Sequence, residues 1–142
     1  MRNDKQTSSK KRVGESSKKE CARFVINTNG TVLDNKTNLT WQREVPDEEF
    51  NWKQAKEYAS QLNLGGYTDW RVPTRDELIG IVDLTRHSPA INPDCFPNTP
   101  SEAFWSSSQY AYGSDDAWNV NFSNGSSDGS YINNSVRVRC VR

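Results

Sequence analysis

The chain has 142 residues, of which 33% are hydrophobic and 11% are aromatic, and its formal net charge is zero. This length suits one domain with one core, built here on a high share of aromatic residues. No apolar run reaches the ~18 residues of a membrane-spanning helix, and the N-terminus lacks the apolar segment of a signal peptide, so we expect no membrane insertion.

The charge is unevenly distributed along the chain. Residues 1–20 carry seven Lys/Arg against three Asp/Glu, whereas residues 21–142 carry eleven against fifteen. The first segment has no apolar periodicity, so burial cannot offset the entropy that it would lose on ordering. We therefore predict a disordered basic tail over residues 1–20 and a folded domain over residues 21–142. The positive charge of the tail would suit an anionic surface or nucleic acid. We interpret the tail as a solubilising segment and expect no nucleic-acid partner.

Short β-prone runs open the folded region. Phe24–Ile26 and Thr31–Leu33 flank Asn29-Gly30, a dipeptide that favours the tight turn of a β-hairpin. A second turn over residues 34–36 leads to a third β-prone run around Leu39. We therefore predict a hairpin followed by a further strand.

The apolar period then changes to that of a helix. Asn51 can cap its start, with Gln54 in the third position of a capping box and Phe50 as a hydrophobic staple. Gly65-Gly66 is predicted to stop this helix. One apolar stripe is formed at three- and four-residue spacing by Trp52, Ala55, Ala59 and Leu62.

A second helix is predicted from about Arg75 to Leu84. Thr74 and Glu77 form the T-x-x-E pattern of a capping box, and Pro73 disfavours helical geometry at the residue before it. The stretch HSPAINPDCFPNTP that follows holds four prolines and is predicted to be an irregular loop. We expect the core-facing residues of the helix to be Leu78, Ile81, Val82 and Leu84.

The stretch from Ser106 to Ser135 is rich in Ser, Asn, Gly and Asp and has no Lys, Arg or Glu. It nevertheless carries a strand pattern, because Trp118, Val120 and Phe122 alternate with polar residues. Asn124-Gly125 then reverses the chain. We predict a folded sheet with its apolar residues buried and its small polar residues displayed.

The last residues also alternate. In the segment SVRVRCVR, Val136, Val138 and Cys140 are separated by Arg137 and Arg139. This pattern predicts a last strand whose outer face is basic.

The three cysteines, Cys21, Cys95 and Cys140, are far apart and show no CxxC or CxxH spacing, so we predict no metal site on them. Cys21 leads into the first predicted strand and Cys140 lies in the last. A Cys21–Cys140 disulfide would join the chain ends if these strands are neighbours. The alternative is an unbridged, buried cysteine.

No pattern indicates a catalytic site. His87 is the single histidine, in a loop where we expect it to face solvent, and Ser106–Ser108 lack the glycine elbow of a nucleophilic serine. We therefore predict a protein that is not an enzyme and uses no cofactor and no metal. Asp115, Asp116 and Asp128 could offer carboxylates to calcium, but a solvated acidic loop explains them better.

Several segments, taken in order, resemble one bacterial family. From about Arg23 to Arg142 the chain resembles the Lcl C-terminal-like domain family, named after a domain of a bacterial collagen-like adhesin. The resemblance implies an α+β fold of the C-type-lectin-like class, related to formylglycine-generating enzyme, with two helices packed on a short twisted antiparallel sheet with long loops. It also implies that the N- and C-terminal strands lie together. The segments are GTVLDNKTNLTWQ, NWKQAKEYASQLNLGGYTDWRVPTRDELIGIVD, INPDCFP, FWSSSQY and VRCVR.

The resemblance further implies a location and a ligand. Members of the family are mostly secreted, lipid-anchored or surface modules, so we expect a secreted or cell-surface protein. The name-giving domain binds sulfated glycosaminoglycans as a trimer, which implies a homotrimer here. The folded region is net acidic, however, and suits a polyanion only if Arg137, Arg139 and Arg142 cluster.

Two functions fit the displayed surface. The first is an adhesion module that binds a glycan or a host- or cell-surface protein, because tyrosine rings stack on sugars and Asn and Asp side chains pair with hydroxyls. Under this hypothesis the ligand-binding residues are Tyr110, Tyr112, Asp115, Asp116, Asn119, Asn121, Ser123, Asp128, Tyr131, Asn133 and Asn134.

The second function is the variable, protein-binding display domain of a diversity-generating retroelement. Adenine-directed mutagenesis of Asn codons yields Ser, Asp, Gly, Tyr and Ile, and antibody paratopes favour several of the same residue types. The residues that fit this spectrum are Asn119, Asn121, Ser123, Ser126, Asp128, Ser130, Tyr131, Asn133 and Asn134.

Overall fold

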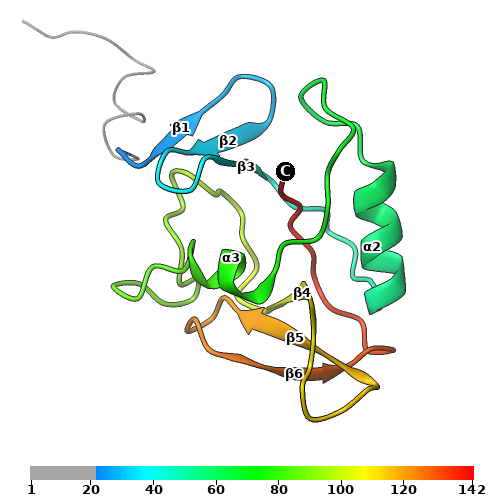
Figure 1. Ribbon diagram of the computed structural model, residues 1–142. Helices are drawn as coiled ribbons and strands as arrows, with labels where there is room; N and C mark the ends of the chain where they lie inside the picture. Colours follow the sequence, from blue (N-terminus) through cyan, green and yellow to red (C-terminus); the bar gives the residue numbers. More distant parts are fainter. Residues whose placement is uncertain (1–21) are drawn as a thin grey trace, which may run out of the picture.

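Two small antiparallel sheets and two short helices make up the computed structural model, which describes residues 22–142 (Figure 1). The predicted α+β class is confirmed, while the predicted basic tail lies outside the described residues. The elements are β1 (Phe24–Ile26), β2 (Thr31–Asp34), β3 (Leu39–Gln42), α2 (Trp52–Gln61), α3 (Arg75–Ile79), β4 (Ala103–Gln109), β5 (Asp116–Asn121) and β6 (Ser127–Tyr131).

The first sheet has the strand order β1-β2-β3. Gly30 has a φ of 86°, a left-handed conformation that glycine adopts without a steric cost, so the Asn29-Gly30 turn forms as predicted. The second turn is built on Asp34, whose carboxylate accepts from the Lys36 N–H at 2.9 Å and from the Thr37 hydroxyl at 2.9 Å. Burial raises the pKa of Asp34, but these bonds and the Arg23 guanidinium outweigh it and hold the pKa below its usual value.

The second sheet has the strand order β4-β5-β6. Gly125, with a φ of 84°, lies in the turn between β5 and β6, as Asn124-Gly125 predicts. The stretch rich in small polar residues is therefore folded, as expected. It contributes two paired strands, including β6, which the sequence pattern did not single out.

Both helices begin where their capping boxes predict, but they end earlier than expected. α2 ends at Gln61, before Gly65-Gly66. The prediction that the second helix reaches Leu84 is wrong, because α3 ends at Ile79 and Gly80 caps it. Beyond the cap, the N–H of Ile81 binds the Leu78 carbonyl in a tighter turn. Leu84 is 81% exposed and does not contribute to the core.

The C-terminal segment, residues 136–142, runs between the two sheets and forms isolated bridges to both, instead of the predicted last strand with a basic outer face (Figure 1). Next to β3, the N–H of Gln42 donates to the Cys140 carbonyl at 3.0 Å. Next to β4, the N–H of Trp105 donates to the Arg137 carbonyl at 2.9 Å. The C-terminal segment therefore lies beside β3, the third strand, whereas within residues 22–142 the first strand, β1, pairs with β2 only.

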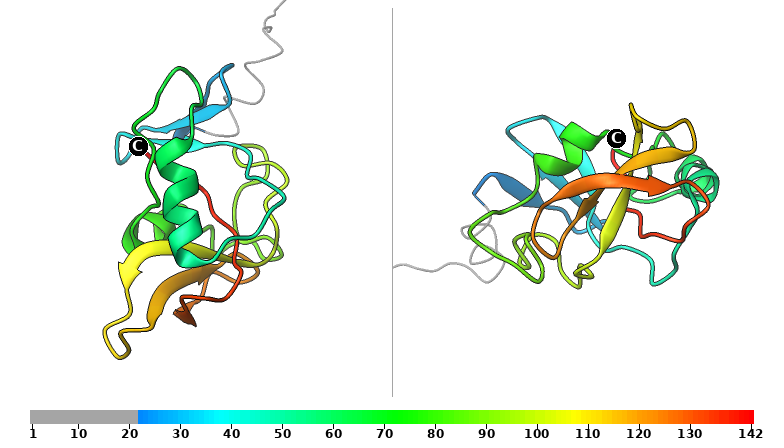
Figure 2. Two further views of the ribbon diagram at one scale, coloured as in Figure 1. Left: turned by 90° about the vertical axis from the view of Figure 1, so that its right-hand side faces the viewer. Right: turned by 90° about the horizontal axis from the view of Figure 1, so that it is seen from below.

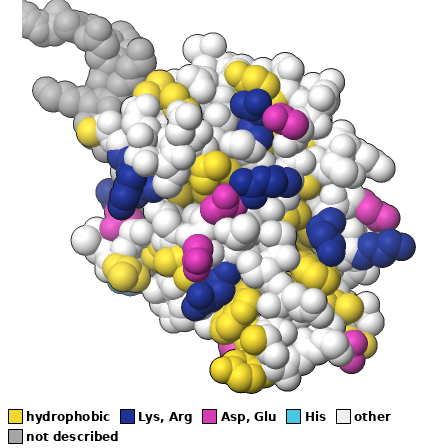
Figure 3. All heavy atoms as spheres, viewed as in Figure 1, with side chains coloured by type: hydrophobic (Ala, Val, Ile, Leu, Met, Phe, Trp, Pro, Cys, Tyr) yellow, Lys and Arg dark blue, Asp and Glu magenta, His cyan; other side chains and the backbone are white. Residues whose placement is uncertain are grey.

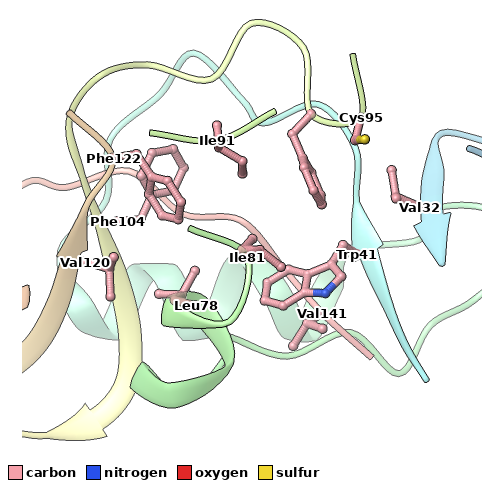
Figure 4. Close-up of a cluster of buried hydrophobic side chains, with 11 residues drawn as sticks. Val32, Trp41, Leu78, Ile81, Ile91, Cys95, Phe104, Val120, Phe122 and Val141 are labelled. Carbon is pink, nitrogen blue, oxygen red and sulfur yellow. The ribbon is translucent and has the colours of Figure 1, made fainter. Parts of the chain in front are cut away.

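The core consists of two clusters of buried side chains. The first lies between the two sheets and takes Trp41 from β3, Leu78 from α3 and Val120 from β5 (Figure 4). The second lies under α2, where Ala55 and Ala59 pack with Trp105 and Val138. The C-terminal segment supplies residues to both clusters and thereby joins them.

Of the two alternatives for Cys140, the disulfide with Cys21 is wrong and the unbridged, buried cysteine is confirmed, because Cys140 is a free, buried thiol. Cys95 is disulfide-bonded, and Cys21 lies outside the described residues. Burial raises the pKa of the Cys140 thiol to about 12, although the neighbouring Arg139 charge opposes this shift. The thiol therefore stays protonated at physiological pH.

We expect Cys140 to resist alkylation in the native protein. Its side chain is fully buried and the thiolate, which is the reactive form, is absent at neutral pH. Treatment with iodoacetamide at pH 8, followed by mass spectrometry, should give no label on Cys140 until urea is added. Rapid labelling without denaturant would contradict the burial of this residue.

Candidate ligand-binding surface

β5 is covered on both faces, which changes the predicted display of its polar residues. Val120 packs in the first core cluster and Ala117 in the second. Asn119 is only 6% exposed, and its side-chain amide donates to the Ser130 hydroxyl at 2.5 Å. The expectation that Asn119 faces a ligand is therefore wrong. The alternating sequence of β5 predicts one solvent-exposed face, but the C-terminal segment and α2 cover that face.

The predicted basic outer face is also wrong. Arg139 is fully buried. Arg137 donates to Glu102 at 2.9 Å, and Arg142 donates to Asp69 at 2.5 Å. These three arginines do not form a cationic cluster, because one is inside the protein and the other two are paired with carboxylates.

An aromatic platform, consisting of Tyr110, Tyr112 and Trp118, stands at the end of the second sheet. The ring centroids of Tyr110 and Trp118 are 4.6 Å apart, and those of Tyr110 and Tyr112 are 5.6 Å apart. Tyr112 is 87% exposed, on the loop between β4 and β5 that projects from the body of the molecule (Figure 2, left). Hydrophobic side chains gather on this lower part of the surface (Figure 3).

Gly129 of β6 is what allows Tyr110 to lie against the sheet. A Cβ atom at Gly129 would lie 2.6 Å from the Tyr110 ring, closer than van der Waals contact permits. Tyr110 therefore rests on the backbone of β6 and reaches the Trp118 ring. Glycine is needed here for close approach.

Arg75 covers the other end of the platform. Its guanidinium lies 4.4 Å from the centroid of the Trp118 ring, within the range of a cation–π interaction. The same group donates to the Ser127 hydroxyl of β6 at 3.0 Å. Because α3 presents Arg75 at its first residue, the capping box of that helix also sets the position of this cation.

The predicted ligand-binding residues divide by exposure. Six are exposed at the surface, four are partly buried and Asn119 is buried. Tyr131 is 48% exposed and its hydroxyl accepts from Asn133 at 3.0 Å. The exposed six are Tyr112, Asp115, Asp128, Tyr131, Asn133 and Asn134, and the partly buried four are Tyr110, Asp116, Asn121 and Ser123.

Four residues of this surface were not predicted as part of the site. Trp118 was expected in the core together with Val120 and Phe122, which are buried as predicted, but it is only partly buried. Arg75, Ser127 and Gly129 complete the set. The sequence carried no signal for them, because Gly129 lies in the run SDGSY, which is poor in β-prone residues and shows no strand pattern.

The structure also shows the positions of the serine, histidine and acidic residues that were considered for catalysis or metal binding. Ser106 is buried and its hydroxyl donates to the Trp118 carbonyl at 2.7 Å, which is a structural role. His87 is exposed, as expected. Within residues 22–142 no group of three or more His, Cys, Asp or Glu side chains is placed to hold a metal ion. No helix in this part of the chain is long and apolar enough to cross a bilayer.

Comparison with known proteins gives one family. The sequence model described as the Lcl C-terminal domain matches residues 30–142, a range that includes both helices and every strand except β1. No curated protein matches the chain. The family match therefore includes the whole aromatic platform.

Proposed function

We propose that this chain, which belongs to the Lcl C-terminal domain family, is a non-enzymatic module that binds a neutral glycan on its aromatic platform. The observation that carries this proposal is the exposure of the Tyr112 ring, which packs edge-on against Tyr110, whose ring in turn packs against Trp118. An aromatic side chain held in place by its neighbours loses little entropy when a sugar face covers it.

Polar groups suited to hydroxyls lie beside the platform. Asp116 pairs with Tyr131 across β5 and β6, so both side chains share one face of the sheet with Trp118. Asp115 is exposed at the end of the same loop. Carboxylates and the tyrosine hydroxyl supply the acceptors and donors that fix the orientation of a sugar.

The charge of this surface favours a neutral sugar over a sulfated one. The segment from Ser106 to Ser135 contributes three Asp residues and no Lys or Arg. Arg137 and Arg142 are engaged by carboxylates, and Arg75 is engaged by Trp118 and Ser127. A polyanion would meet net negative charge here, whereas a neutral sugar would not.

Replacing Tyr112 by alanine is expected to weaken glycan binding by about tenfold, since one stacked ring is lost. The measurement is binding to an array of neutral and sulfated glycans at low and high salt, where binding of a neutral glycan should not depend on salt. Tyr67→Ala is the matched control, because Tyr67 is 39% exposed and lies under Arg142, in a different part of the fold. An array on which no neutral glycan binds would remove the proposal. Binding of sulfated glycans alone, lost at high salt, would replace it with a charge-driven one.

A variable display domain is the second candidate function. Of the nine residues that fit adenine-directed mutagenesis, all except Asn119 are exposed or partly buried on β5, β6 and their loops. Such residues could change without affecting the core. A near-repeat of the 3′ end of the gene beside a reverse-transcriptase gene would support this function and count against a fixed sugar site.

We also propose a fold type and a cellular location for this protein. We infer a variant of the C-type-lectin-like fold. Two features support it: the C-terminal segment lies beside β3, and both helices come between the first and the second sheet in the order of the chain. We infer an extracellular location, supported by the disulfide at Cys95, because such bonds persist in oxidising compartments. Peptide mapping without reduction, on protein recovered from cells, tests this and identifies the partner of Cys95. The homotrimer stays a prediction.

A further inference from the structure

We propose that the free edge of β6 binds an extended, basic polypeptide segment by strand addition. β6 (Ser127–Tyr131) is the last strand in its sheet, and within residues 22–142 it pairs with β5 only. Seen from below, β6 crosses the front of the molecule (Figure 2, right). The site adjoins the aromatic platform at Tyr110, but it uses backbone groups of β6 and admits a different class of ligand.

The pairing register shows which backbone groups of β6 point outward. The N–H of Asn121 donates to Ser126 and the N–H of Ile132 donates to Asp115, so residues 126, 128, 130 and 132 direct their backbone groups toward β5. Ser127, Gly129 and Tyr131 therefore direct theirs to the open edge.

Two of the outward groups are satisfied locally. The Tyr131 carbonyl accepts from the Asn134 N–H at 2.9 Å, and the Gly129 N–H donates to the Asp128 carboxylate at 2.8 Å. The groups left for a partner are the N–H and carbonyl of Ser127, the carbonyl of Gly129 and the N–H of Tyr131. They form a row that an added strand can pair with.

β6 has no lysine, proline or bulge to block its edge, and its one protecting feature is the Asp128 carboxylate on the Gly129 N–H. Proteins protect such strands with lysine, proline or a bulge. The sequence of β6 is SDGSY, with Asp128 as its single charged residue, and its pairing with β5 is continuous. The edge is therefore open to another strand.

Charge and shape define the partner. Asp128 faces one side of the strand, so a cationic residue of the partner would be stabilised beside it. The partner residue opposite Gly129 would lie next to the Tyr110 ring, which suits an apolar side chain. The favoured segment therefore alternates apolar and cationic residues.

A second copy of this chain fits less well. In an antiparallel pair of β6 strands centred on Gly129, the two Asp128 carboxylates would be diagonal neighbours on one face. Like charges at that spacing repel. The charge on the edge thus favours a basic partner over self-association.

A phage-displayed library of linear twelve-residue peptides, selected on the full chain, tests the proposal. We expect selected peptides to alternate Lys or Arg with apolar residues. Tyr131→Pro should weaken their binding by about tenfold or more, because proline has no N–H to donate, and edge strands tolerate proline where the N–H faces solvent. Tyr131→Ala, which keeps the N–H, is the matched control and should bind within about twofold of the parent chain.

Asp128→Lys is a second test that does not depend on proline. This variant should also weaken peptide binding by about tenfold. Circular dichroism checks that each variant is folded, and if Tyr131→Pro is unfolded then Asp128→Lys decides. No enrichment of basic peptides, or equal binding by the proline and alanine variants, would overturn the proposal. So would a dimer, measured by light scattering, that Tyr131→Pro dissociates. Loss of glycan binding in Tyr112→Ala does not affect this proposal, so the two proposals can fail independently.

Discussion

Replacing Arg139 by alanine is expected to lower the free energy of unfolding by about 4 kcal/mol. The guanidinium is fully buried and donates to the carbonyls of Gln42 at 2.6 Å and Arg43 at 2.5 Å and to the Thr99 hydroxyl at 2.7 Å. It also lies 4.8 Å from the Phe96 ring centroid. Arg139 therefore ties the C-terminal segment to the end of β3.

Two effects of this substitution oppose each other. Burial lowers the pKa of Arg139 to about 9, which reflects the cost of keeping a cation among neutral oxygens, and alanine removes that cost. It also leaves two backbone carbonyls without their donor, at about 1–3 kcal/mol each, and opens a cavity the size of a large side chain. We expect the second effect to be larger, because carbonyls at this depth have little access to water.

Urea denaturation of two further variants separates these contributions. Arg139→Met fills most of the volume but donates no hydrogen bonds, so it should lose about half as much stability as Arg139→Ala. Arg142→Ala removes a partly buried arginine paired with the exposed Asp69 and should leave the urea midpoint nearly unchanged. Equal midpoints for the alanine variants of Arg139 and Arg142 would contradict the role of Arg139 in tying the C-terminal segment to the end of β3.

Replacing Trp105 by alanine is expected to cost about 3–5 kcal/mol of folding free energy. Trp105 is fully buried in the second core cluster, and its indole N–H donates to the Phe50 carbonyl at 2.7 Å. Trp52 of α2 returns the contact, donating its indole N–H to the Ser106 carbonyl at 2.8 Å. These reciprocal bonds fasten the start of α2 to β4.

The matched comparison is Trp52→Ala. Trp52 is only partly buried and Lys56 lies over its ring, so its loss should destabilise the protein less than the loss of Trp105. Trp105→Phe keeps most of the apolar volume and should cost about 1–2 kcal/mol, mainly from the lost indole hydrogen bond. The Phe50 carbonyl keeps its second donor, the Val136 N–H at 2.9 Å. Urea unfolding followed by circular dichroism gives the three values. A larger loss for Trp52→Ala than for Trp105→Ala would reverse our assignment of the core residue.

The features that sequence reasoning placed correctly are local ones. Both capping boxes form, because Asn51 with Gln54 and Thr74 with Glu77 need only three-residue spacing. The Asn-Gly turn at Gly30 forms because glycine adopts the left-handed conformation of this turn without a steric cost, whatever the distant parts of the chain do. The length of α3 was misjudged, since apolar spacing continued past Gly80 although the chain turned there.

The candidate site was predictable only in outline. Tyr112 and Tyr131 are exposed as expected, because a loop and an edge strand leave large side chains in water. The partners that hold the platform come from distant segments, with Arg75 on α3 and Gly129 on β6. No periodicity in one segment encodes a contact with another.

The sequence by itself determined the hairpin turns, the helix starts and the burial of Val120 and Phe122, because each depends on a pattern of neighbours a few residues away. Only the tertiary structure decided which polar residues are inside. The C-terminal segment enters the space between the sheets, so Arg139 and Asn119 are buried where strict alternation predicts exposure. An alternating pattern marks two faces of a strand, but what covers each face is settled by the packing of the whole chain.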